Sequence, residues 1–225
     1  MRQFVRLYKN AVPIQDLKVL NSEEYKAFMC KKGKPVKLVS TRKHFRFIPH
    51  NELYYDFFNK NRLFWLIPMD LPDGGFIGFI LRSFEGKAYA TYNGDYGKQV
   101  LYGLHSFGSF SIGTPIVVTE GVKDREYLAQ FYPYCVACLS SAPSRESVNL
   151  LRGMSNKFVF AFDNDKTGVA QSLNMSKKFA RLGANCATFI PRQGKDWGSF
   201  FSMPGLESTT KLGLLELLPS LRKSI

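Results

Sequence analysis

Three short apolar runs, each ending at a change to polar residues, constrain the fold of this chain most. Residues 115–119 (PIVVT) end at Glu120–Gly121, and residues 157–162 end at Asp163. A third run spans residues 134–139, and helix-like segments separate the three. Strands that alternate with helices predict a parallel sheet with right-handed crossovers. Ligands of such sheets bind beyond the carboxyl ends of the strands, so Glu120 and Asp163 are expected at one edge.

The carboxylates at this edge suggest a metal site. Glu120, Asp163 and Asp165 would repel one another at short range, and one would be driven to protonate unless a cation intervened. Hard oxygen ligands suit Mg²⁺ or Mn²⁺, which often need only one or two carboxylates together with substrate phosphates. An alternative stays open: residues 163–168 (DNDKTG) could be a turn followed by a helix N-cap, which needs no metal.

Three stretches in this region, VVTEGVKDREYLAQ, FAFDNDKTG and RQGKDWGSFF, resemble the TOPRIM domain of topoisomerases and DnaG-type primases. The resemblance implies that Glu120 is the general base or an acid next to the metal. It implies that Asp163 and Asp165 are metal ligands. Asp124 matches the acidic residue four positions after the family's glutamate. Asp196 matches the aspartate of a later loop, where Trp197–Gly198 stands in place of the family's Pro-Asp.

Basic residues are concentrated at the amino-terminal end. The net charge is +13, and residues 1–50 hold 12 Lys or Arg and only 3 acids. Such a concentration is typical of a protein that binds a phosphate backbone, although a solvated basic face would look the same. Aromatic residues are interleaved with these cations, as in STRKHFRFIP. They could stack on bases or form a sheet edge with a basic outer face.

The segment 51–113 contains a second resemblance. NRLFWLIPMD and FIGFILRSF flank a Pro-Asp-Gly-Gly turn, which predicts a β-hairpin. This run and YATYNGDYGKQVLYGL resemble the core of DnaG-type primases, although Ala90 replaces a lysine of the family. The residues expected to face nucleotide or template are Arg62, Arg82, Asn93, Lys98 and Lys166.

The four cysteines do not form a metal or disulfide framework. Cys135 and Cys138 have the spacing of half a zinc knuckle, but no second pair accompanies them. We therefore expect buried, reduced thiols within a strand. The first twenty residues lack the apolar core of a signal peptide, and the uncharged stretches contain too many Gly, Pro and Ser for a membrane span. We expect a cytoplasmic protein without membrane contact, in the host cytoplasm if its origin is a phage.

These observations predict an α/β protein in three parts. A smaller, mixed α+β basic subdomain (1–113) precedes a TOPRIM domain (114–201), whose parallel sheet of about four strands is flanked by helices. A helical tail (202–225) follows and is expected to dock on the domain. The resemblance covers roughly residues 55–201. No zinc ribbon or helicase part of the family is visible in this sequence, which suggests a phage or mobile-element origin.

The expected function is that of a primase, which makes short RNA primers on single-stranded DNA by two-metal phosphoryl transfer. The expected cofactor is Mg²⁺ or Mn²⁺, the substrates are nucleoside triphosphates, and a replicative helicase or a separate zinc-ribbon protein is an expected partner. A TOPRIM nuclease would use the same metals with water as the attacking group. A DNA-binding accessory protein without catalysis is the third hypothesis, but clustered acids facing DNA would not favour binding.

Overall fold

The computed structural model describes residues 12–13, 46–48, 64–70, 76–83, 89–92, 101–140, 143–203 and 205–222. Several sequence expectations fall elsewhere and therefore stay predictions. These are the roles of Arg62, Asn93 and Lys98 and of the basic segment 1–50.

A four-stranded parallel sheet carries the fold. Its strands are β6 (Ile116–Thr119), β7 (Cys135–Ala137), β8 (Lys157–Phe160) and β9 (Asn185–Thr188), in the order β7-β6-β8-β9. Every neighbouring pair is parallel. The parallel sheet expected from the alternation of apolar runs and helical segments is therefore confirmed, with each strand slightly shorter than its apolar run.

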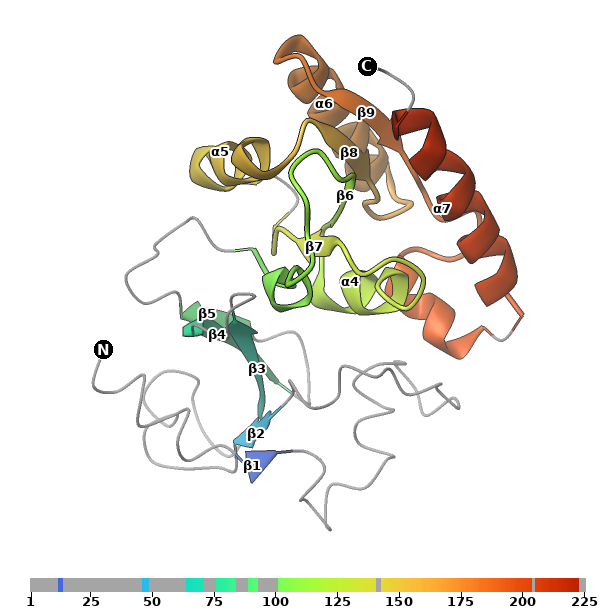
Figure 1. The fold of residues 1–225 in the computed structure, drawn as a ribbon. Coiled ribbons are helices and arrows are strands. Elements are labelled where there is room, and N and C mark those ends of the chain that lie inside the picture. The colour runs from blue at the N-terminus through green and yellow to red at the C-terminus, as the bar shows by residue number, and fades with distance from the viewer. Residues whose placement is uncertain are drawn as a thin grey trace.

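Helices flank this sheet (Figure 1). They are α4 (Val122–Leu128), α5 (Arg145–Met154), α6 (Lys166–Arg181) and α7 (Glu207–Arg222), with 3₁₀ turns η4 (Leu104–Ser106) and η5 (Trp197–Ser202). The Ser144 side chain caps α5 by accepting a hydrogen bond from the Ser147 amide at 3.0 Å. Gly183 follows α6 with a φ of 83°, the left-handed conformation that glycine adopts readily.

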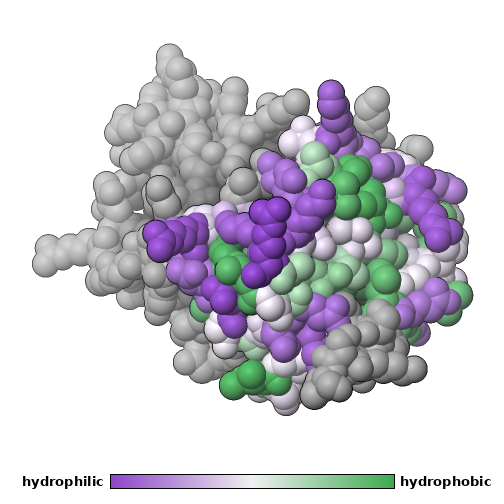
Figure 2. Space-filling model, turned by 90° about the horizontal axis from the view of Figure 1, so that it is seen from above, coloured by the Kyte–Doolittle hydropathy of each residue, from purple (hydrophilic) through white to green (hydrophobic). Residues whose placement is uncertain are grey.

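Apolar side chains from both faces of the sheet form the core. Phe158 and Phe160 of β8 are fully buried, and both rings meet Phe179 of α6 edge-on. Leu214 and Leu218 bury the inner side of α7, which contacts β9 and β8. The tail therefore docks on the domain, as expected. Hydrophobic patches separated by hydrophilic side chains also remain on the outer face seen in Figure 2.

The helix of the tail extends further than its apolar pattern suggested. The helical spacing stopped at Pro219, yet α7 continues to Arg222. A proline lacks the backbone N–H and usually breaks a helix interior. Here only the last turn follows it, so few hydrogen bonds of the helix depend on that position.

The amino-terminal half contributes an antiparallel sheet in the order β1-β2-β3-β4-β5. Its strands are β1 (Val12–Pro13), β2 (Arg46–Ile48), β3 (Phe64–Asp70), β4 (Phe76–Ser83) and β5 (Tyr89–Tyr92). The hairpin expected around the Pro-Asp-Gly-Gly turn is confirmed by the antiparallel pairing of β3 with β4. Ile67, Met69 and Ile80 of this hairpin are buried in the same apolar cluster as the parallel sheet.

The expectation of buried, reduced thiols is also met. Cys135 and Cys138 are free and buried, and burial raises the pKa of each thiol to about 12. The strand that carries Cys135 lies at the edge of the parallel sheet, where the backbone of Tyr102 pairs with Ala137. Among the described residues, no helix is both long and apolar enough to cross a membrane.

Candidate functional site

Glu120 and Asp163 follow two neighbouring parallel strands. Strand β6 pairs with β8 in the register Val118↔Phe160, and the Ala161 amide donates to the Val118 carbonyl at 2.8 Å. The chain leaves both strands at the same edge of the sheet, so the two acids lie at one rim. This position was predicted from the sequence, because both acids directly follow the ends of apolar runs.

The acids of this rim influence one another electrostatically. Burial raises the pKa of Asp163 to about 6, and the negative charges of Glu120 and Asp196 add to this effect. The pKa of Glu120 is also raised, first by burial and then by the charge of Asp165. Lys195 lowers both values. The rim therefore holds excess negative charge, which a bound cation would neutralise.

Asp165 has two roles that use different oxygens. Its Oδ1 accepts a hydrogen bond from the Gly168 amide at 2.9 Å and caps α6, which lowers the pKa of Asp165. Its Oδ2 lies 3.3 Å from the Lys195 ammonium. The helix N-cap left open by the sequence is thus present, and it leaves the second carboxylate oxygen available for a cation.

Asp124 connects α4 to η5, and so holds the loop that precedes η5. Its carboxylate is 6% exposed, and Oδ1 accepts a hydrogen bond from the Gly198 amide at 2.8 Å. Burial raises the pKa of Asp124 to about 7. Gly198 itself has no room for a side chain, since a Cβ there would lie 2.6 Å from the Cβ of Lys123. The close packing of η5 on α4 explains why glycine occurs at this position.

Asp196 lies in the same loop and caps η5. Its Oδ1 accepts a hydrogen bond from the Ser199 amide at 2.7 Å. Its charge contributes to the raised pKa of Asp163 and of Asp124, so it belongs to the acidic rim. Each of these two carboxylates accepts a hydrogen bond from a backbone amide. Ion binding by Asp124 and Asp196 stays a prediction.

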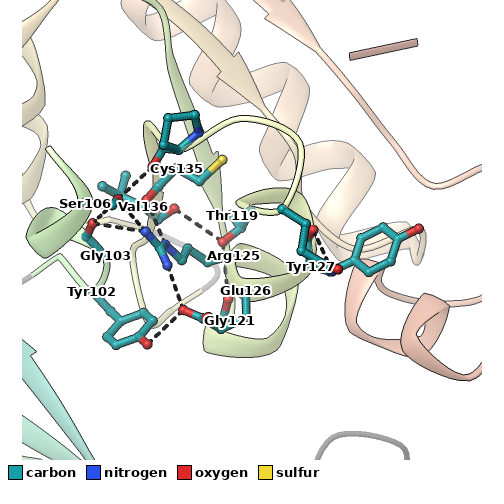
Figure 3. A network of polar contacts seen from close by, with 12 residues as sticks. Tyr102, Gly103, Ser106, Thr119, Gly121, Arg125, Glu126, Tyr127, Cys135 and Val136 are labelled. Atoms are coloured by element: carbon teal, nitrogen blue, oxygen red, sulfur yellow. Dashed lines mark hydrogen bonds and ion pairs between the residues drawn. The ribbon is translucent and has the colours of Figure 1, made fainter. Parts of the chain in front are cut away.

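A buried polar network centred on Arg125, the residue after Asp124 in α4, was not predicted from the sequence (Figure 3). Arg125 and Glu126 are fully buried and form an ion pair at 2.7 Å. The Arg125 Nε donates to the Cys135 carbonyl at 3.0 Å, and its Nη2 donates to the Gly103 carbonyl at 3.3 Å. The Tyr102 hydroxyl donates to Glu126 Oε1 at 2.8 Å. The network joins α4, the start of β7 and the segment that leads to η4.

Two further residues next to the site were missed. Lys195 stands in the GKDWGSFF stretch, where the resemblance drew attention only to the acid and its neighbours. Leu139 donates its amide to the Glu120 carbonyl at 2.9 Å while adopting a φ of 61°. Such a backbone conformation is uncommon for a side chain other than glycine and is frequent near functional sites. No local pattern could have identified it.

The cationic residues proposed for nucleotide or template binding are only partly placed. Lys166 is exposed at the first turn of α6, directly after Asp165. Arg82 belongs to β4, where it pairs across to Trp65 and Tyr89. Their contacts with a ligand remain predictions, as do those of the three residues outside the described part.

The donor chemistry of the rim fits a divalent cation of the Mg²⁺ type. Its donors are mainly oxygens, and the pKa values of Glu120 and Asp163 are raised. One carboxylate oxygen of Asp165 already lies beside a positive charge, the Lys195 ammonium. In the part of the chain that the structure describes, no three His, Cys, Asp or Glu side chains are drawn together into a ready-made coordination shell. The assignment of individual metal ligands therefore stays a prediction.

Comparison with known proteins gives two kinds of similarity. Residues 117–201 match the protein family described as Toprim-like. A DNA primase from Clostridium acetobutylicum is 28% identical over 171 residues, which are 73% of this chain. The chain spans 28% of the length of that relative.

Solved structures share the fold across almost the whole chain. A DnaG primase catalytic domain bound to single-stranded DNA has a TM-score of 0.69 at 17% identity, covering 96% of this chain and 77% of that one. The RNA polymerase domain of Mycobacterium tuberculosis primase DnaG, in complex with double-stranded DNA, has a TM-score of 0.65 at 16% identity. It covers 97% of this chain and 78% of that domain.

Proposed function

Because the chain contains a Toprim-like domain within the fold of the DnaG-type primase catalytic domain, we propose that it is the nucleotidyltransferase core of a DNA primase. Its product is a short RNA primer made on single-stranded DNA. The observation that carries this proposal is the meeting of Glu120 and Asp163 at the carboxyl edge of β6 and β8, with Asp165 beside them.

The acidic rim is the proposed cation site. Glu120, Asp163 and Asp165 hold Mg²⁺ or Mn²⁺ in this proposal, with Asp124 and Asp196 as further candidates. Two divalent cations at such a site supply neutralisation of the triphosphate charge and a lowered pKa of the attacking hydroxyl. Without a cation, burial and the neighbouring negative charges make it costly for Glu120 and Asp163 to remain ionised.

The chain's own residues then orient the reactants. The 3′-hydroxyl oxygen of the growing primer bonds to the α-phosphorus of the incoming nucleotide, and the bond to the β-phosphate oxygen breaks, which releases pyrophosphate. Glu120 accepts the hydroxyl proton in this scheme. Positioning and charge neutralisation supply most of the rate enhancement in phosphoryl transfer.

Template and nucleotide are held by cations outside the rim. Arg62, Arg82, Asn93, Lys98 and Lys166 are the proposed contacts. The basic segment 1–50 follows the phosphate backbone of the single strand. The exposed position of Lys166 next to Asp165 supports its place in this set.

Template selection and contact with a helicase are further functions that a primase needs. The chain covers 28% of the curated relative's length, so we assign template selection and helicase contact to parts or partners other than residues 1–225. A replicative helicase and a zinc-ribbon protein are the proposed partners. The place of action that we propose is the cytoplasm.

Incubation with single-stranded DNA, labelled nucleoside triphosphates and Mg²⁺ or Mn²⁺ tests the function. We expect labelled oligomers that disappear in Asp163→Ala and Glu120→Gln. Shortened template in place of oligomers would show the TOPRIM nuclease instead. If neither product formed, even with a helicase and a zinc-ribbon protein added in turn, the hypothesis of a DNA-binding accessory protein would be the one left.

A further inference from the structure

Lys195 contacts the acidic rim directly, although no role for it was predicted from the sequence. Its Nζ lies 3.3 Å from Asp165 Oδ2 and 4.0 Å from Asp163 Oδ2. The ammonium therefore bridges the two carboxylates that are the proposed metal ligands. Because Asp165 Oδ1 is occupied by the Gly168 amide, Oδ2 is the oxygen that a second cation would also need.

The backbone around Lys195 is fixed to the rim. The Asn164 amide donates to the Lys195 carbonyl at 2.6 Å, and the Asn164 side chain donates to the Gly194 carbonyl at 3.3 Å. On the other side, the Gly198 amide is held by Asp124 at 2.8 Å. Lys195 thus starts from a defined place beside Asp163 and Asp165, which distinguishes it from a lysine on a loose surface loop.

The side chain of Lys195 is nevertheless free to leave. It is 63% exposed, and its partner Asp165 is 41% exposed. An ion pair of this exposure is weak, because water screens it. A divalent cation that binds both carboxylates interacts with each of them more strongly than one ammonium does.

We propose that Lys195 and a divalent cation compete for the carboxylate oxygens of Asp163 and Asp165, so that Lys195 sets the cation concentration at which the site fills. This inference rests on the proposed function only in taking the rim as the cation site. Lys195 lowers the repulsion between the acids and moves into solvent when the cation binds. The chain thereby carries its own counter-ion, which raises the threshold for metal loading.

Equilibrium binding of Mn²⁺ alone, followed by the electron paramagnetic resonance signal of the free ion, tests the competition without any priming reaction. We expect Lys195→Gln to bind Mn²⁺ about three- to tenfold more tightly than wild type in low salt. The gain should shrink in about 0.5 M KCl, where exposed charges are screened. Lys195→Arg, which keeps the charge, should stay near the wild-type affinity.

Lys177→Gln is the matched control, because it removes the same charge from an exposed position further along α6. An equal gain in both glutamine variants would overturn the proposal, since net charge alone would explain it. Unchanged or weaker binding in Lys195→Gln, with binding lost in Asp163→Asn, would also overturn it while leaving the cation site intact. Absence of Mn²⁺ binding in wild type would remove the site and the competition together. Tighter Mn²⁺ binding in Lys195→Gln would support the competition. If the wild type made no primers in the assay described above, the proposed function would be contradicted while the competition stood.

Discussion

Gly168 lies directly against the backbone of Asp163. A Cβ built on Gly168 would overlap the Asp163 carbonyl oxygen and stand 2.8 Å from its amide nitrogen and carbonyl carbon. The first turn of α6 therefore approaches the end of β8 as closely as the backbone allows. This contact brings the Asp165 cap and the Asp163 carboxylate to the same rim.

The contact predicts that Gly168→Ala will damage the site. In an ordinary helix position this change stabilises by about 1 kcal/mol, because glycine is the poorer helix former. Here the overlap is with rigid backbone, so we expect a loss of about 1 to 3 kcal/mol in the free energy of unfolding. Displacement of Asp163 should also lower primer synthesis about tenfold to a hundredfold.

Gly153→Ala provides the matched control, because a Cβ there meets nothing within 4 Å. Urea unfolding should show this variant to be equal to or more stable than wild type. A Gly168→Ala protein as stable and active as Gly153→Ala would contradict the close approach.

Asp124 predicts a pH-dependent stability. Burial raises its pKa to about 7, whereas the same carboxyl in an unfolded chain titrates near its ordinary value of about 3.9. Between these values the unfolded chain releases a proton that the folded chain keeps. The contribution of Asp124 to stability is therefore full below about pH 4, falls as the pH rises towards about 7, and is level above that.

Asp124→Asn should remove this dependence, because the amide oxygen can still accept from Gly198 but does not ionise. Relative to wild type, we expect the variant to gain about 1 to 3 kcal/mol more stability at pH 8 than at pH 5, in the presence of EDTA. Urea unfolding at both pH values measures the difference. The same relative stability at pH 5 and pH 8 would show that Asp124 does not titrate in this range.

Divalent cations should stabilise the folded protein through the rim. A ligand that binds only the folded state at ten times its Kd raises the free energy of unfolding by about 1.4 kcal/mol. We expect Mn²⁺ to raise the thermal midpoint of wild type but not that of Glu120→Gln or Asp163→Asn. Glu146→Gln, which removes a charge from an exposed position of α5, should respond as wild type does. An equal response in all four proteins would place the bound ion elsewhere.

The buried pair Arg125–Glu126 should be costly to break. Arg125→Met leaves the Glu126 carboxylate in the interior with only the Tyr102 hydroxyl of this network, so we expect a loss of about 3 to 5 kcal/mol. Replacing both partners, as in Arg125→Met/Glu126→Leu, should cost less than the sum of the two single changes.

Chemical denaturation of the single and double variants tests this coupling. Arg152→Met, at an exposed position of α5, should change stability by no more than about 0.5 kcal/mol. Additive effects of the Arg125 and Glu126 variants would show that the pair does not act as a unit.

Local patterns in the chain were enough to predict the strands, their parallel pairing and the acids that follow them. Apolar runs of strand length ending at Glu120 and Asp163 carry that information locally, because burial and the two-residue or helical periodicity act over short stretches. The helix N-cap at Asp165 could also be predicted from the local sequence. The end of α7 was harder to predict. Proline usually ends a helix, but α7 packs on β9 and continues past Pro219.

The surroundings of these acids became visible only in the folded chain. Lys195 meets Asp163 and Asp165 because the Asn164 backbone fixes the loop beside them, and Arg125 is buried because Tyr102, Gly103 and Cys135 converge on it. Such contacts join residues far apart in the chain, and their strength depends on burial and distance. Both quantities exist only once the chain has folded.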